Sequence, residues 1–388
     1  MTGPEQSAVN DSCLPITLYG PELSYFTGKL EAVIRFMELP YQRLPAGPMS
    51  EEPLAAGVAQ VPAVRLADKR WMTDSTPIIG WLHDRYPRHQ VIPTNPVLRF
   101  FSLLLEDYAD EWLWRPAMHY RWDYAEGAAL QGRVLIDENA HDMPLPGALK
   151  RYLIRNRQRK LFTRGDGVGP DTWDHVEKTY LDTLAQFKTV LADRPYLLGT
   201  RPSLADFGFF GPMFRHFSMD PTSARIMRET APSVYEWVAR VWNARSSGGG
   251  ELLDTLPADW QPIMHSIGAT YLPYLVANAN AWSQSQERFD AVIEGVNYRN
   301  LRTAPYRVWC LEQLRGHYDS LSDADKITVR PVLENTGCWQ PLWDNATLAS
   351  QIDPDQKAPF GGGGSMTGVS LKSALKINWM PAGKAHSR

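Results

Sequence analysis

The chain has 388 residues, of which 44% are hydrophobic, 40 are basic and 43 are acidic, giving a formal net charge of -3. A single hydrophobic core seldom grows beyond about 250–300 residues, so this length predicts two or three packed units. The two signs of charge are spread along the chain, which excludes a field strong enough to attract a polyanion such as nucleic acid.

Membrane and secretion signals are not found either. No run approaches the roughly 18 apolar residues that a membrane span needs, and the opening from Met1 to Ser12 has no apolar stretch of the signal-peptide kind. The three cysteines, Cys13, Cys310 and Cys338, are odd in number and far apart. We therefore expect free thiols, no metal site and a cytoplasmic protein without membrane contact.

The first ninety residues alternate between strand and helix signals. Apolar runs closed by turn residues predict strands, and apolar residues spaced three or four apart predict helices. The expected elements, in chain order, are a strand at Ile16–Tyr19, a helix around Leu30–Met37, strands at Tyr41–Leu44, Ala63–Leu66 and Arg70–Met72, and a helix from Ser75 that ends before Pro87.

From Pro96 onward strand signals fade and amphipathic stretches dominate, which predicts an all-helical domain. The basic run Lys150–Lys160 is interrupted by apolar residues and is typical of a solvated helix face. The clearest helical stretches are Leu98–Trp114, Trp173–Leu191, Ser203–Phe217 and Ser233–Trp242.

Beyond a glycine-rich candidate linker at Ser246–Gly250, the segment Glu251–Phe360 is rich in Trp and Tyr and has mixed helical periodicity. We expect a further helical unit there. Within it, Tyr298–Leu314 has an amphipathic pattern that predicts a helix covering a substrate cleft or forming a partner surface.

The end of the chain is different in composition. Gly361–Ser365 spells GGGGS, a flexible linker of the engineered kind, and Met366 begins a basic segment that ends at Arg388. Two interpretations stay open. Either a short partner or peptide substrate is tethered to raise its effective concentration, or the segment is a cloning tail.

Three local patterns follow one another in the first ninety residues, and a fourth lies in the helical region. The patterns are Ser24-Tyr25-Phe26-Thr27-Gly28-Lys29 after Leu18-Tyr19-Gly20, Gln60-Val61-Pro62-Ala63-Val64, Thr73-Asp74-Ser75-Thr76-Pro77, and the helix-capping sequence Pro202-Ser203-Leu204-Ala205-Asp206-Phe207. In this order and spacing they resemble the glutathione transferase superfamily, in its serine type.

The resemblance covers the first ninety residues and part of the helical region, and it implies an α+β protein. It implies a thioredoxin-like glutathione-binding domain at 14–90 and an all-helical transferase-type domain at 95–250. The helical extension at 251–360 goes beyond the usual length, and the linker at 361–365 and the segment at 366–388 follow it. Homodimers are common in the superfamily, so a homodimer is expected.

The resemblance assigns the catalytic hydroxyl to Ser24. At a helix N-terminus, unpaired N–H groups and the helix dipole favour a thiolate, and a hydroxyl there donates a hydrogen bond to the glutathione sulfur. Tyr19 and Tyr25 are alternative donors, and a simple N-cap is the ordinary role of such a serine. With Ser24 and Thr27 in place of the two cysteines of C-x-x-C, thiol–disulfide exchange has no attacking group.

The other two patterns supply the glutathione-binding residues that the resemblance implies. Pro62 is expected to be cis, so that Val61 pairs through its main chain with the cysteinyl unit of glutathione, with Gln60 beside it. Ser75 at a helix start is expected to receive the γ-glutamyl carboxylate, and Asp74 the ammonium. A trans proline and an ordinary helix cap are the plain alternatives.

The second substrate is expected between the domains, against an aromatic stretch of the helical region. A small apolar or aromatic electrophile would suit such a lining, although rings at helical spacing also suit a core. The candidate pocket residues are Tyr108, Trp112, Arg115, His119 and Trp122.

The expected function is therefore a transferase or lyase in which enzyme-bound glutathione, the co-substrate, is the nucleophile and no metal takes part. Two alternatives remain. One is a non-catalytic scaffold of the same fold that binds a protein or peptide, and the other is a peptide-modifying enzyme that acts on the tethered segment.

Overall fold

The structure is a computed structural model that describes residues 11–45, 60–139, 144–344 and 348–360. The linker expected at 361–365 and the basic segment at 366–388 lie outside the described residues. Secondary structure within the described ranges follows the expected α+β order, with one small sheet near the start and helices through most of the remainder.

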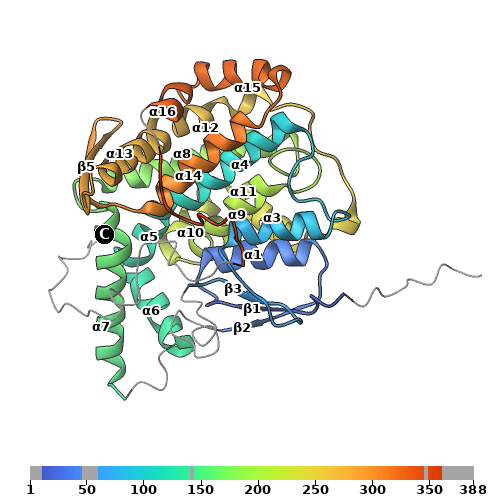
Figure 1. Ribbon diagram of the computed structural model, residues 1–388. Coiled ribbons are helices and arrows are strands. Elements are labelled where there is room, and N and C mark those ends of the chain that lie inside the picture. Colours follow the sequence, from blue (N-terminus) through green and yellow to red (C-terminus); the bar gives the residue numbers. More distant parts are fainter. Residues whose placement is uncertain (1–10, 46–59, 140–143, 345–347, 361–388) are drawn as a thin grey trace, which may run out of the picture.

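The N-terminal domain is a four-stranded sheet with two helices on one face, between the sheet and the rest of the protein (Figure 1). The strand order is β2-β1-β3-β4, with β2 parallel to β1 and with β3 and β4 antiparallel to their neighbours. This is the thioredoxin-like arrangement that the sequence predicted. Its elements are β1 (Ile16–Tyr19), α1 (Tyr25–Phe36), β2 (Tyr41–Leu44), β3 (Ala63–Arg65), β4 (Trp71–Thr73) and α3 (Ser75–Arg85).

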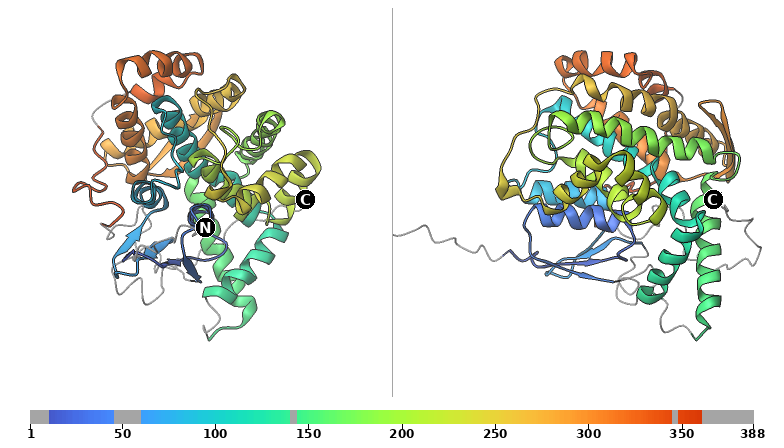
Figure 2. Two further views of the ribbon diagram at one scale, coloured as in Figure 1. Left: turned by 90° about the vertical axis from the view of Figure 1, so that its right-hand side faces the viewer. Right: turned by 180° about the vertical axis from the view of Figure 1, so that it is seen from behind.

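The helical domain is organised around α9, in which every residue is buried. A helix that is apolar all round belongs at the centre of a bundle, and α9 packs against both α4 and α1 and so joins the two domains. The pair α6 and α7 (green) projects from the body beside the sheet (Figure 2). The helices are α4 (Pro96–Glu111), α5 (Trp114–Trp122), α6 (Ala125–Asn139), α7 (Gly147–Gln158), α8 (Trp173–Asp193), α9 (Leu204–Pro212), α10 (Pro221–Thr230) and α11 (Pro232–Asn243).

The extension is mostly helical, and α14 and α15 pack against α4. It also contains a β-hairpin, β5–β6, that the sequence analysis missed. The hairpin turns at Glu294 and Gly295, both with positive φ (48° and 78°), which is the two-residue turn that suits twisted strands. The elements are α12 (Gln261–Ser266), α13 (Leu272–Ser283), β5 (Arg288–Ile293), β6 (Val296–Arg302), α14 (Pro305–Asp319), α15 (Asp323–Asn335) and α16 (Trp339–Trp343).

One continuous hydrophobic cluster runs through all three units. The last described segment, 348–360, then returns to the first domain, where the carbonyl of Pro359 accepts a hydrogen bond from Thr73 N–H (3.0 Å). The ring of Phe360 meets the ring of Trp81 edge-on (5.6 Å). We call this segment the strap; it covers the outer edge of β4.

The cysteines agree with the expectation of free thiols. All three cysteines are free and buried. In the described part of the chain, none of the helices is both long and apolar enough to cross a membrane.

Candidate functional site

The strand register brings the three N-terminal patterns to one end of the sheet. Tyr19 at the end of β1 pairs with Ala63 at the start of β3, and Ala63 pairs with Thr73 at the end of β4. The segment after Tyr19, the segment before Ala63 and the segment after Thr73 therefore leave the sheet side by side. These segments contain Ser24, Pro62 and Asp74 respectively.

Ser24 caps helix α1. Its backbone is extended (φ -75°, ψ 123°), and its hydroxyl oxygen accepts a hydrogen bond from the N–H of Thr27 (3.3 Å). The side chain is half-buried. The hydroxyl proton is not used in this contact, because the oxygen is the acceptor, so it remains available to a ligand at the helix N-terminus.

Three side chains hydrogen-bond to the backbone of the loop that precedes Ser24. Because they come from a strand and two helices, they fix the position of the loop relative to both domains. They are Arg43 on the carbonyl of Gly20 (3.2 Å), Glu138 on the N–H of Glu22 (3.1 Å) and Arg121 on the carbonyl of Leu23 (2.8 Å).

The two alternative donors have different surroundings. The hydroxyl of Tyr25 donates to the backbone carbonyl of Asp110 in α4, and burial raises the pKa of this phenol well above its usual value. Tyr19 is almost fully buried, with its ring against that of Trp71 (5.1 Å), and burial raises its pKa as well. Of the three predicted hydroxyls, Ser24 combines partial exposure with a helix N-terminus.

The peptide bond between Val61 and Pro62 is cis, as the sequence predicted. Val61 and the preceding Gln60 are half-buried. The main-chain N–H and C=O of Val61 form no hydrogen bond with the described residues. Both groups can therefore pair with an extended peptide ligand, as an added strand would.

Asp74 and Ser75 begin helix α3. The carboxylate of Asp74 accepts a hydrogen bond from Thr76 N–H (3.3 Å), and Ser75, the first helical residue, is buried. The φ of Asp74 is 72°, a conformation that costs a residue with a side chain about 1–3 kcal/mol and is concentrated at functional sites. Burial raises the pKa of Asp74 to about 6, and the nearby Lys29 opposes the rise.

The extension reaches this acid. Tyr306 in α14 donates its hydroxyl to the second carboxylate oxygen of Asp74 (3.2 Å). The sequence placed Tyr306 in a helix expected either to cover a substrate cleft or to form a partner surface. Its contact with the residue predicted to hold the glutathione ammonium places this helix over the candidate site.

A buried ion-pair network under the site was not predicted. Lys29 of α1 is fully buried and bonds through Nζ to the carboxylates of Glu106 and Asp110 (2.5 Å for Asp110). Thr76 of α3 contributes its hydroxyl to Lys29 (3.2 Å) and to Glu106 (2.6 Å). The network therefore ties α1, α3 and α4 together directly beneath Asp74.

The five residues predicted to line the substrate pocket lie mostly in the core. All five are buried, with exposed fractions between 0% and 3% among Tyr108, Trp112, Arg115, His119 and Trp122. The Arg115 guanidinium lies between the rings of Trp112 and Tyr274 (4.4 and 4.1 Å to the centroids), so the extension fills the space where a substrate was expected. The two ring nitrogens of His119 contact Asp123 (3.1 Å) and Glu177 (3.0 Å).

A different aromatic group stands next to the Ser24 loop. Phe26, Trp114 and Phe162 are half-buried, with ring centroids 5.9 Å apart for Phe26–Trp114 and 5.2 Å for Trp114–Phe162. They line a narrow cleft of about 40 Å³ together with Tyr306. Trp122, from the predicted set, belongs to the apolar cluster against which Trp114 and Phe162 pack.

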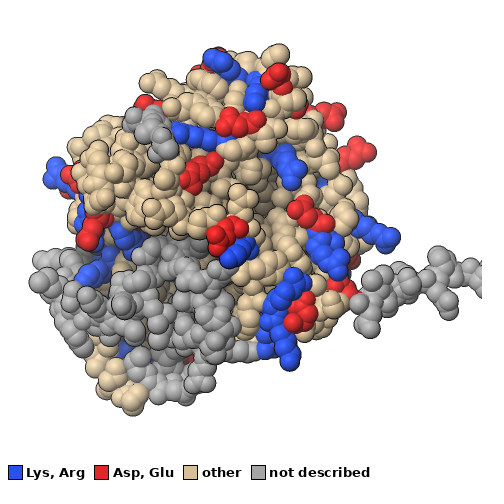
Figure 3. All heavy atoms as spheres, viewed as in Figure 1, with Lys and Arg blue, Asp and Glu red and all other residues tan. Residues whose placement is uncertain are grey.

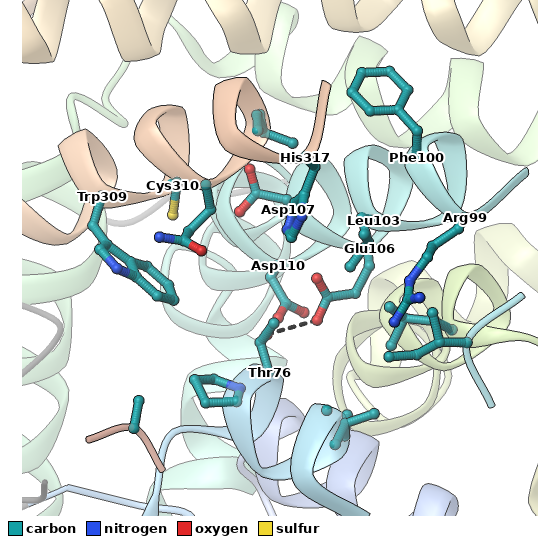
Figure 4. A pocket seen from close by; sticks show the side chains of 18 of the residues that line it. Thr76, Arg99, Phe100, Leu103, Glu106, Asp107, Asp110, Trp309, Cys310 and His317 are labelled. Carbon is teal, nitrogen blue, oxygen red and sulfur yellow. Dashed lines mark hydrogen bonds between the residues drawn. The ribbon is translucent and has the colours of Figure 1, made fainter. Parts of the chain in front are cut away.

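A much larger cavity, of about 840 Å³, lies between α3, α4 and α14 (Figure 4). It shares Asp110, Glu111 and Tyr306 with the narrow cleft. Basic and acidic side chains are both scattered over the described part of the face shown in Figure 3.

The family model of the glutathione S-transferase C-terminal domain matches residues 171–244, which hold α8 to α11. Residues 171–244 are therefore similar to the C-terminal domain of glutathione S-transferases. The capping sequence at the start of α9 lies inside the matched region and forms the predicted box, in which Asp206 accepts the Ser203 N–H (2.9 Å).

Several solved structures are similar to the chain over about 60% of its length. The beta-etherase LigF from Sphingobium sp. strain SYK-6 is 19% identical, covering 60% of this chain and 96% of that one, with a TM-score of 0.42. A glutathione S-transferase from Rhodospirillum rubrum F11 is 16% identical over 60% of this chain and 90% of that one, with a TM-score of 0.40. Another, from Methylobacterium radiotolerans, in complex with glutathione sulfonate, is 16% identical over 62% and 94%, with a TM-score of 0.37. Among curated proteins, none matches the sequence.

Proposed function

We propose that the protein is a glutathione transferase-type enzyme. It binds glutathione at the end of the sheet where Ser24, Val61 and Asp74 meet, and the bound thiolate attacks a small apolar or aromatic electrophile. The observation that carries the proposal is the strand register, which sets a helix-capping hydroxyl, an unpaired main-chain segment and a second helix N-terminus side by side. These are the parts that a thiol-bearing tripeptide with two charged ends requires.

Two of the three units of glutathione, the γ-glutamyl and the cysteinyl units, have matching groups in this proposal. The γ-glutamyl carboxylate lies at the N-terminus of α3 against Ser75, where free N–H groups and the helix dipole favour an anion. The ammonium of the same unit pairs with Asp74. The cysteinyl unit adds to the sheet through the main chain of Val61, which is unpaired within the described residues.

The chemistry follows from the place of the sulfur. A thiol has an ordinary pKa near 8.5, and the Ser24 hydroxyl together with the N-terminus of α1 lowers it by stabilising the charged form. The thiolate gives its electron pair to the electrophilic carbon, and in a substitution or cleavage the leaving group departs with its bonding pair. The protein's part is to bind, orient and hold the thiolate.

The electrophile site of the proposal is the aromatic cleft beside the loop. Phe26 is two residues from Ser24, and its ring packs on Trp114, which in turn meets Phe162. Half-buried aromatic rings beside a thiolate favour a flat apolar electrophile. In this proposal the second substrate lies against Phe26, Trp114 and Phe162. The candidates from the sequence, such as Tyr108 and Trp112, are buried instead.

A scaffold that binds a peptide without conjugating it is the second candidate. The observation that favours it is the contact of Tyr306 with Asp74, which already occupies the acid that the glutathione ammonium would use. The tethered segment 366–388 would be the partner in this case, or the substrate of a peptide-modifying reaction. We further propose, from the superfamily resemblance, a cytoplasmic homodimer, for which sedimentation should give twice 43.9 kDa.

The test is calorimetric titration of glutathione into the full chain and into Ser75→Ala. Removing a hydrogen-bond donor to a carboxylate should weaken binding by about 1–3 kcal/mol. Ser223→Ala is the matched control, because Ser223 is also buried and hydrogen-bonded but lies in α10. Equal affinity of Ser75→Ala and the control variant would refute the site, and no glutathione binding to the unaltered chain would favour the scaffold.

A further inference from the structure

The large cavity has a wall of acidic side chains. Four carboxylates from the last turns of α4 line it, and Figure 4 shows those of Asp110 and Glu106 directed toward Thr76. The opposite walls are α3, α14 and the strap residues 353–358. The four acidic residues are Glu106, Asp107, Asp110 and Glu111.

The cations that bond to these carboxylates are fewer than the carboxylates. Lys29 serves both Glu106 and Asp110. Arg307 bonds to Glu111 (2.9 Å) and is shared with a further acid, Asp166 (2.8 Å). The lining of the cavity also includes Arg99, but its side chain is exposed at the surface. Within the described residues the wall therefore has more carboxyl groups than partner cations, and burial raises the pKa of Asp107 to about 7 and that of Asp110 well above its usual value.

One carboxylate oxygen at this wall has no partner. The side chain of Asp110 is 7% exposed, and its Oδ1 is buried without a hydrogen bond from the described residues, whereas Oδ2 bonds to Lys29. A buried unpaired carboxylate oxygen is costly, since it has lost water and gained no donor. Asp110 lines the cavity, so a donor that enters the cavity can satisfy this oxygen.

The remaining lining is apolar and aromatic. Phe100, which is buried, and Leu103, which is half-buried, come from the turns of α4 that precede the acids. Tyr306 and Trp309 stack on each other in α14 (5.3 Å between centroids). Aromatic faces attract cations, and apolar walls exclude water from a charged pair. A ligand that fits both parts has a positive end with several donors and an apolar body.

We propose that this cavity binds a primary ammonium group carried on an apolar stem, with the Asp110 carboxylate as its main acceptor. The ammonium has three donors, enough for Oδ1 of Asp110 and for a second carboxylate such as Asp107. The stem lies against Leu103 and Trp309. The proposal does not rest on the proposed function, although the cavity shares Asp110, Glu111 and Tyr306 with the narrow cleft assigned above to the electrophile.

Two sources carry this chemistry, a free amine and a lysine of the chain's own segment 366–388. The segment contains Lys372, Lys376 and Lys384 and has no acidic residue. Ala358 lines the cavity, and a chain reaches about 45–50 Å over the fourteen positions from there to Lys372, so the cavity lies within its range. A short flexible linker of this kind gives an effective concentration in the millimolar range.

The experiment titrates hexylamine, with hexan-1-ol as the neutral match, into the full chain. Hexylamine should bind at least about tenfold more tightly than the alcohol, and Asp110→Asn should remove that difference. Leu103→Trp fills the cavity without changing its charge and should weaken both ligands. Asp319→Asn, an exposed acid on α14, should change neither.

The full-length triple variant Lys372→Gln/Lys376→Gln/Lys384→Gln separates the two sources. Tighter hexylamine binding in this variant assigns the lysines as the resident ligand, and unchanged binding assigns a free amine. Equal affinity for amine and alcohol in both the unaltered chain and the triple variant would overturn the proposal. Competition by saturating glutathione would overturn it too, because the carboxylates would then belong to the glutathione site.

Discussion

Ser24 has two roles that separate into two measurements. As the cap of α1 it accepts the Thr27 N–H, and as the proposed donor it stabilises the sulfur. The cap role affects the stability of the helix, by about 1 kcal/mol, and the donor role affects the pKa of the bound thiol. A substitution at this residue should change both quantities.

For Ser24→Ala we expect glutathione to bind with near-normal affinity and its thiol pKa to rise, so that conjugation at neutral pH falls about ten- to a hundredfold. The thiolate absorbance in the ultraviolet measures the pKa directly. Asn95→Ala is the control, since Asn95 caps α4 (Leu98 N–H, 3.1 Å) and its loss weakens a helix without approaching the sulfur. An unchanged thiol pKa in Ser24→Ala would transfer the role to Tyr19 or Tyr25.

Asp74 predicts a pH dependence of binding. Its pKa of about 6 means that the carboxylate, which would pair with the glutathione ammonium, becomes neutral as the pH falls through that value. The affinity should therefore be about tenfold lower at pH 5 than at pH 7, a range in which the carboxyl and ammonium groups of glutathione keep their charges. The bound thiol changes its own charge near neutral pH in this proposal, so S-methylglutathione, which has no thiol, is the ligand to titrate. In Asp74→Asn its calorimetric affinity should be weak and flat over the same range, and an unaltered slope there would contradict the assignment.

At the residue scale, the sequence predicted what neighbouring residues encode. The cap at Ser24 and the placement of Asp74 at a helix start each depend on three or four adjacent positions. The cis bond before Pro62 was expected from the resemblance and not from the local sequence. Contacts between distant positions could not be predicted. Lys29 and Asp110 are 81 positions apart, and Tyr306 and Asp74 are 232 apart.

At the scale of elements, the cap of α9 holds more than its own helix. Asp206 accepts hydrogen bonds from Ser203 N–H, from Leu197 N–H (2.8 Å) and from the indole N–H of Trp237 (3.2 Å). It thereby joins α9 to the preceding loop and to α11. Because α9 packs on both α1 and α4, the position of the N-terminal domain depends on this cap.

Asp206→Ala leaves three buried donors without an acceptor and should lower the free energy of unfolding by about 3 kcal/mol or more. Chemical denaturation measures the loss. Asp206→Asn keeps one carbonyl acceptor and should lose less. Glutathione affinity at a temperature where the variant is folded should stay within about twofold, since the cap does not contact the ligand groups; a large change in affinity at unchanged stability would contradict this separation.

The β5–β6 hairpin shows where element prediction failed. Residues in β5 alternate between exposed and buried, as a half-buried strand requires, but the run is only six residues long. Its turn is Glu-Gly rather than the Asn-Gly or Asp-Gly pair that marks such turns most clearly. The sequence therefore predicted only helical structure in this segment, because the alternating run is short and lies between two strongly helical segments.

At the scale of the whole molecule, the extension is part of the core and not a separate appendage. The hydrophobic cluster runs without a break from the sheet into α14 and α16, and Arg307 of α14 bonds to Glu111 at the end of α4. The sequence predicted a packed extension. It could not predict that Tyr274 would enclose Arg115, because no local pattern links the two residues.

A shared core predicts shared unfolding. Thermal or denaturant unfolding of the full chain should follow one cooperative transition, with far-ultraviolet circular dichroism and tryptophan fluorescence giving the same midpoint. A chain that ends after Gly250 should not fold, because it would expose the apolar faces of α4 and α8 that the extension covers. Two separated transitions would show that the extension folds independently.

The strap also affects how readily the sheet of one molecule can pair with the sheet of another. An uncovered strand edge is a template on which other chains add strands, and the outer edge of β4 is of that kind. Here Pro359 occupies the Thr73 N–H, and Phe360 lies against Trp81. The protein thus supplies its own blocking group against edge-to-edge aggregation at the Thr73 end of β4, and that group comes from a segment that lies far along the chain from the sheet.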